Sequence, residues 1–103
     1  MKILLMEKNL ILLSRIRSSL SGHEVRTGWD HQGEELVLIN LEQFSPEIIK
    51  SLKEKGAKVI AYCGHKRLDL INLAKELGAD LVVPNSQIIN AAELISKVLK
   101  TPP

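Results

Sequence analysis

The sequence is poor in aromatic residues, in cysteine and in long apolar runs. It has one Phe, one Tyr, one Trp and one Cys among 103 residues, so an internal disulfide framework is excluded and the core must be aliphatic. No apolar stretch reaches the roughly 18 residues that span a bilayer. Charged and polar residues at 7–9 interrupt the N-terminal apolar segment, which argues against a signal peptide. These absences predict a cytoplasmic protein that does not enter a membrane.

The charge is also close to balance. Fourteen Lys and Arg oppose 12 Asp and Glu, which gives a net charge of +2, and the basic residues are spread along the chain, so no nucleic-acid partner is indicated. A composition of 45% hydrophobic and 25% charged residues fits a folded chain. Because 103 residues suffice for one domain, we expect a single domain over residues 1–103.

The chain does contain a regular alternation of short apolar runs and amphipathic segments. The runs predict strands at 2–6, 24–27, 36–39, 57–63 and 80–83. Helical periodicity and end signals predict helices at 10–20, 45–56, 67–78 and 87–100. We expect Leu10 and Leu99 on the buried faces of the first and last helices. With right-handed crossovers, the alternation predicts an α/β protein with a doubly wound, five-stranded parallel sheet.

One connection breaks this alternation. Only seven residues, GWDHQGE, join the second and third predicted strands. An extended chain spans about 3.3 Å per residue, but a helix rises only about 1.5 Å, so the second helix should be missing or reduced to a turn. Trp29 lies in this link. Either it is a plug over the sheet that the absent helix would have covered, or it marks a bared face that binds another protein or a second copy of this chain.

The segments LLMEKN, GHEV, LVLINL, VIAYCGH and LGADLVVP occur in an order and spacing that resemble the response-regulator receiver domain (CheY-like). The resemblance covers roughly residues 2–100. It implies a flavodoxin-like fold with strand order 2-1-3-4-5 and a role in bacterial signal transduction. It also implies where a phosphorylation site would lie.

At the central positions of that site, this sequence carries other residue types. The acidic pair that holds magnesium in receivers corresponds to Glu7 and Lys8, and the aspartate that accepts the phosphoryl group corresponds to Asn40. One carboxylate, one ammonium and one amide are a poor ligand set for Mg²⁺, and an amide cannot form an aspartyl phosphate. We expect Lys8 to pair with Glu7 or with the Asn40 amide oxygen and so to hold one conformation.

Three further positions depart from the family pattern. Cys63 stands where receivers have the Thr or Ser that hydrogen-bonds the phosphoryl group, Val83 replaces the lysine before proline, and Leu81 replaces the switch aromatic residue. We expect Cys63 to be a small buried apolar residue. Leu81, like Trp29, is a candidate for contact with a partner.

These positions predict a degenerate site and a chain that is not an enzyme and uses no cofactor or metal. We expect a phosphorylation-independent pseudo-receiver that binds a protein partner in signalling and could also form a homodimer. One alternative is a small-ligand or anion-binding module that uses the loops at 7–9, 40–45 and 63–67, where a glycine turn with a basic edge precedes a helix. The other is an atypical phosphorylatable response regulator. Cys63 and His65 alone do not form a metal-ligand framework.

Overall fold

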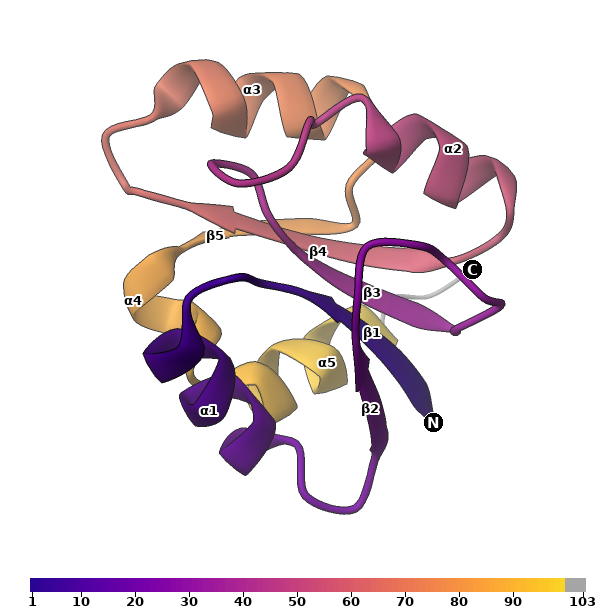
Figure 1. Cartoon of the computed structure of the whole chain (residues 1–103). Helices are drawn as coiled ribbons and strands as arrows, with labels where there is room; N and C mark the ends of the chain where they lie inside the picture. Colours follow the sequence, from indigo (N-terminus) through magenta and orange to yellow (C-terminus); the bar gives the residue numbers. More distant parts are fainter. Residues whose placement is uncertain (100–103) are drawn as a thin grey trace.

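The computed structural model describes residues 1–99. The strands are β1 (Lys2–Met6), β2 (Glu24–Thr27), β3 (Leu36–Asn40), β4 (Lys58–Cys63) and β5 (Leu81–Pro84). The helices are α1 (Leu10–Ser19), α2 (Ile48–Glu54), α3 (Leu68–Glu76), α4 (Asn85–Ile88) and α5 (Ala91–Leu99). Neighbouring strands run parallel in the order β2-β1-β3-β4-β5, with helices on both faces of the sheet (Figure 1). The doubly wound, flavodoxin-like receiver fold is therefore confirmed.

Alternate residues of the central strands enter two separate cores. On β3, Leu36 and Leu38 pack with residues of α1 and α5, whereas Val37 and Ile39 pack with residues of α2 and α3. All five residues of β3 are buried, as expected for a parallel strand that is covered on both faces. The continuous apolar run in the sequence thus reflects two-sided burial.

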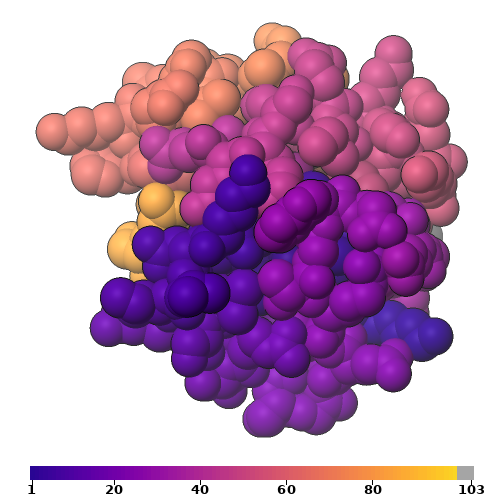
Figure 2. Space-filling model, in the orientation of Figure 1, coloured from indigo at the N-terminus to yellow at the C-terminus, as the bar shows by residue number. Residues whose placement is uncertain are grey.

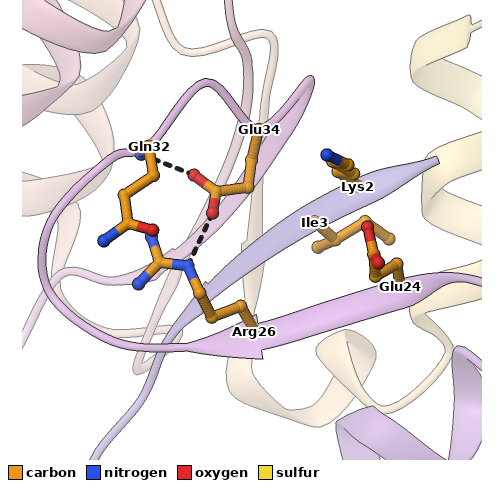
Figure 3. Close-up of a pocket in the computed structure, with 6 residues that line it drawn as sticks. All are labelled: Lys2, Ile3, Glu24, Arg26, Gln32 and Glu34. Carbon is orange, nitrogen blue, oxygen red and sulfur yellow. Dashed lines mark hydrogen bonds and ion pairs between the residues drawn. The ribbon is translucent and has the colours of Figure 1, made fainter.

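The link between β2 and β3 contains no helix, as its length predicts. Glu34 in this link is only 7% exposed. It accepts hydrogen bonds from Arg26 Nε at 2.7 Å and from the Gln32 backbone N–H at 2.8 Å. The hydrogen bond from Arg26 lowers the pKa of Glu34 to about 2. The side chains of Arg26, Gln32 and Glu34 line a hollow of about 330 Å³ at the β1–β2 edge of the sheet. Lys2, Ile3 and Glu24 complete its lining (Figure 3).

The interpretation of Trp29 as a buried plug is wrong, because its side chain is 59% exposed. The Arg26–Glu34 ion pair, and not Trp29, lies over the β1–β2 edge of the sheet (Figure 3). Arg26 also donates to the backbone carbonyl of Asp30, which fixes the link. Trp29 follows the carboxyl end of β2 and contacts Phe44, with 5.6 Å between the ring centroids. The face where a second helix would lie is therefore covered by charge pairing and not by an aromatic ring.

Helix α1 begins as its sequence predicts but buries a different set of residues. The side-chain oxygen of Asn9 accepts a hydrogen bond from the Leu12 backbone N–H at 3.0 Å and caps the helix. Leu10 is 78% exposed, contrary to expectation. The helix packs on the core from Leu12 onward, whereas Leu10 and Ile11 face solvent.

The C-terminal helical region also differs from the sequence prediction. The helix expected over 87–100 is divided into α4 and α5, and residue 100 lies outside the described residues. The Asn90 carbonyl accepts the Leu94 backbone N–H and starts the second helix. Leu99 is exposed, because the buried stripe of α5 instead follows Ala91, Leu94, Ile95 and Val98. None of the helices within residues 1–99 combines the length and the apolar character needed to cross a bilayer.

The predicted helix at 45–56 starts later than expected. Ser45 and Pro46 form a turn, and the regular helix α2 begins at Ile48. The Ser45 hydroxyl oxygen still accepts the Glu47 backbone N–H at 3.3 Å. The helix ends before Gly56, whose φ of +85° suits glycine. Ser45 and Pro46, which predict a helix start, therefore belong to a turn that precedes the helix, whereas Gly56 follows the end of the helix as predicted.

Candidate functional site

The ends of three strands bring Glu7, Asn40 and Tyr62 to the same face of the sheet. Met6 lies opposite Ile39, and Asn40 lies opposite Tyr62 in the parallel register. Since side chains alternate along a strand, Glu7, Asn40 and Tyr62 all point toward the α1 and α5 side. All three are buried, and Glu7 is only 1% exposed. A buried carboxylate, amide and phenol must find hydrogen-bond partners.

We name these three residues the Glu7 cluster, because Glu7 accepts hydrogen bonds from the side chains of the other two. Its Oε1 accepts from Asn40 Nδ2 at 2.8 Å and from the Tyr62 hydroxyl at 2.8 Å. Its Oε2 accepts from the Asn9 backbone N–H at 2.9 Å. Asn40 Oδ1 accepts from the Glu42 backbone N–H at 2.9 Å. Both carboxylate oxygens and both ends of the Asn40 amide are therefore engaged.

Tyr62 is the member of the cluster that sequence reasoning missed. Burial raises the pKa of the Tyr62 hydroxyl above its usual range, and the charge of Glu7 and the hydrogen bond to it raise it further. The hydroxyl therefore stays protonated and serves as a donor. The sequence does contain an indication of this contact, because the hydroxyl of a lone tyrosine in a largely aliphatic strand needs a hydrogen-bond partner when it is buried.

Lys8 does not join the cluster, so the predicted pairing with Glu7 or with the Asn40 amide oxygen is wrong. Its ammonium lies 5.0 Å from the ring centroid of Phe44 and 5.8 Å from that of Trp29. The physical reason is that consecutive residues at a strand end point in opposite directions. Glu7 turns into the core, and Lys8 turns to the aromatic rings at the surface.

Cys63, Val83 and Leu81 lie apart from the polar contacts of the cluster. Cys63 is fully buried in the core beneath α2 and α3. Burial raises the pKa of its thiol, and the charge of Glu42 adds to this effect, so it is a neutral core residue. Val83 and Leu81 pack in the other core, beneath α5. The structure therefore brings together Glu7 and Asn40 but separates them from the other positions of the predicted site.

The Glu7 cluster does not fit a magnesium ion. Mg²⁺ requires near-octahedral oxygen ligands, with carboxylates among them, whereas the single carboxylate here already accepts three hydrogen bonds. The amide presents its nitrogen to that carboxylate. Within residues 1–99, no three His, Cys, Asp or Glu side chains are grouped so that they could hold a metal. We therefore assign no magnesium-dependent chemistry to this cluster.

A second polar group surrounds the 63–67 loop, which is one of the loops of the predicted anion-binding alternative. Glu42 Oε2 accepts from the Gly64 backbone N–H at 3.0 Å, and its Oε1 lies 3.5 Å from Arg67 Nη1. Arg67 also pairs with Asp69 at 3.1 Å. Carboxylates of this chain therefore engage the backbone N–H and the guanidinium that a bound phosphate would use, which counts against the anion-binding alternative.

Comparison with known proteins finds likeness in structure but not in sequence. No family model and no curated protein sequence matches this chain. A response regulator from Thermotoga maritima superposes with a TM-score of 0.80 at 16% identity, covering 97% of this chain and 98% of the other. An orphan response regulator of H. pylori gives 0.79 at 21% identity, with 97% of each chain covered.

A response regulator receiver domain from Rhodospirillum rubrum gives a TM-score of 0.70 at 18% identity, covering 99% of this chain and 97% of the other. At such identities the likeness shows the fold alone. The structural neighbours are thus receiver domains, in agreement with the resemblance in the sequence.

Proposed function

We propose that this chain is a receiver-like signalling module that binds a protein partner without being phosphorylated. The observation that carries this proposal is the Glu7 cluster. The position that corresponds to the phosphoacceptor aspartate holds an amide, Asn40, whose nitrogen donates to a buried carboxylate at 2.8 Å. An amide offers no carboxylate oxygen for attack on phosphorus. This amide is also held at both ends.

The cluster also supports a single resting arrangement at this edge of the sheet. Its hydrogen bonds join β1, β3 and β4 through Glu7, Asn40 and Tyr62. A hydrogen bond to a charged group contributes about 1.5–3 kcal/mol. A ligand shifts a conformational equilibrium only if it binds one state more tightly, and the cluster offers a phosphoryl group no such interaction. A partner would then bind a surface that is always present.

The proposal is tested with acetyl phosphate and Mg²⁺. The chain is incubated with both, and its intact mass and two-dimensional NMR spectrum are recorded beside those of an active receiver domain as the positive control. We expect no phosphoryl adduct and no spectral change, with beryllofluoride giving the same result. A phosphoryl adduct would refute the proposal in favour of an atypical phosphorylatable regulator.

A further inference from the structure

We infer that Lys8, Trp29 and Phe44, which we name the Trp29 surface, bind an acidic and partly apolar segment of a protein partner. The inference rests on the proposed function, because it names the partner chemistry of the interaction module. Trp29 belongs to the β2–β3 link and Phe44 to the β3–α2 connection. Their rings are tilted by 51° with 5.6 Å between centroids.

This surface presents apolar area to solvent. More than half of the Trp29 side chain is exposed, and tryptophan is enriched among the residues that contribute most to protein interfaces. Figure 2 shows the indigo N-terminal part of the chain lying against the purple β2–β3 link on this face. Contacting a partner would remove the Trp29 ring from water, which is favourable.

The charge of Lys8 indicates the kind of partner. Its ammonium lies over both rings, since ring faces attract cations. The ion pairs found within residues 1–99 use Arg26, Lys53 and Arg67 and leave Lys8 without a carboxylate. The ammonium is therefore held at the surface beside exposed apolar area. A carboxylate that neighbours an apolar side chain matches both features.

Two other occupants fit this surface less well. A two-fold contact between copies of this chain would bring the two Lys8 ammonium groups toward each other, which is unfavourable. A nucleic acid needs a row of basic residues, whereas this surface is defined by the single ammonium of Lys8 over the two rings. Lys8 also covers one face of each ring, where a base would stack.

The test selects peptides from a phage-displayed random 12-mer library on the immobilised full chain. We expect the selected peptides to place Asp or Glu next to Leu, Ile or an aromatic residue. The selected sequences are then synthesised as labelled peptides, and their affinity for the chain is measured by fluorescence anisotropy. Lys8→Gln should weaken binding about fivefold, as expected for the loss of an exposed ion pair. Trp29→Ala should weaken it at least tenfold.

Matched variants provide the controls. Lys66→Gln removes an exposed lysine elsewhere, and Leu68→Ala truncates an exposed apolar side chain on α3. Both should bind the peptides as the wild type does. Lys8→Glu should reject the acidic peptides and bind their Lys-substituted counterparts, a gain that misfolding cannot produce.

Several outcomes would overturn the inference. The inference fails if the library yields basic peptides, neutral peptides or no peptides. It also fails if Lys8→Gln and Lys66→Gln weaken peptide binding equally. A dimer in sedimentation analysis, or binding of a single-stranded oligonucleotide, would also overturn it if either is lost in Trp29→Ala. The proposed function fails separately, through a phosphoryl adduct, and that result does not depend on peptide binding.

Discussion

Replacing Asn40 with aspartate tests whether the Glu7 cluster requires an amide. The amide nitrogen lies 2.8 Å from Glu7 Oε1, and both residues are buried. The substitution places an oxygen where the donor was. With an effective dielectric constant of about 20, two charges roughly 4 Å apart repel by about 4 kcal/mol. When both carboxylates are ionised, the hydrogen bond to Glu7, worth about 1.5–3 kcal/mol, is also lost.

The pair can relieve this repulsion by holding one proton, which limits the loss of stability and makes it depend on pH. The pKa of the shared proton is then raised above the ordinary aspartate value of about 3.9. The folded state binds a proton that the unfolded state releases, so stability falls as pH rises, by about 1.4 kcal/mol per pH unit. Relative to the wild type, we expect little loss near pH 4, about 1.5 kcal/mol at pH 5 and about 4 kcal/mol at pH 7.

Urea denaturation at pH 5 and pH 7, followed by far-ultraviolet circular dichroism, measures this dependence. The control is the double variant Glu7→Gln with Asn40→Asp, in which the amide and the carboxylate exchange places, and which should lose most of the pH dependence. A single Asn40→Asp variant as stable as the wild type at pH 7 would refute the buried hydrogen bond. We also expect no phosphorylation of this variant by acetyl phosphate, because Lys8, Cys63 and Val83 are unchanged.

Three further substitutions test other contacts. Tyr62→Phe removes a donor to the buried carboxylate and should lower the free energy of unfolding by about 1.5–3 kcal/mol in urea; a loss below 0.5 kcal/mol would argue against that bond. Arg26 lowers the pKa of Glu34 to about 2, so this pair stabilises the fold above about pH 4.5 and loses about 1–2 kcal/mol as pH falls toward 2, after allowance for solvent screening. Glu34→Gln should remove most of this loss of stability between about pH 4.5 and about pH 2, as measured by urea denaturation. Glu42→Ala frees the Gly64 backbone N–H, so sulfate should raise the thermal midpoint of this variant more than that of the wild type; equal shifts would contradict the role assigned to this carboxylate.

The strands were predictable because their signals are local. The runs at 2–6 and 24–27 match β1 and β2 residue for residue, since the polar residues 7–9 follow the first and Gly22 and Gly28 flank the second. The missing helix followed from length alone, because seven residues cannot form a helical crossover. The late start of α2 shows the limit of such signals, since a cap and a proline serve a turn as well as a helix.

The partners of Glu7 were not predictable in the same way. They come from positions 33 and 55 residues away in the chain, and their meeting depends on the register of three strands. Trp29 was misplaced for another reason. Its expected burial is an average preference of tryptophan, and the average gives no weight to the Arg26–Glu34 pair that covers the sheet instead.

The Glu7 cluster and the Trp29 surface are adjacent in the chain, because Glu7 belongs to the first and Lys8 to the second. The order of the buried cluster therefore affects the order of the exposed surface. Glu7 is held by three donors, so the backbone at Lys8 is fixed on one side. On the other side, the Lys8 N–H donates to Gln43 Oε1 at 2.7 Å, and Gln43 directly precedes Phe44. Lys8 and Phe44 are thus positioned relative to each other by contacts within the chain. Because ordering of side chains opposes association, a surface ordered in this way should bind a partner more tightly than a mobile one of the same composition.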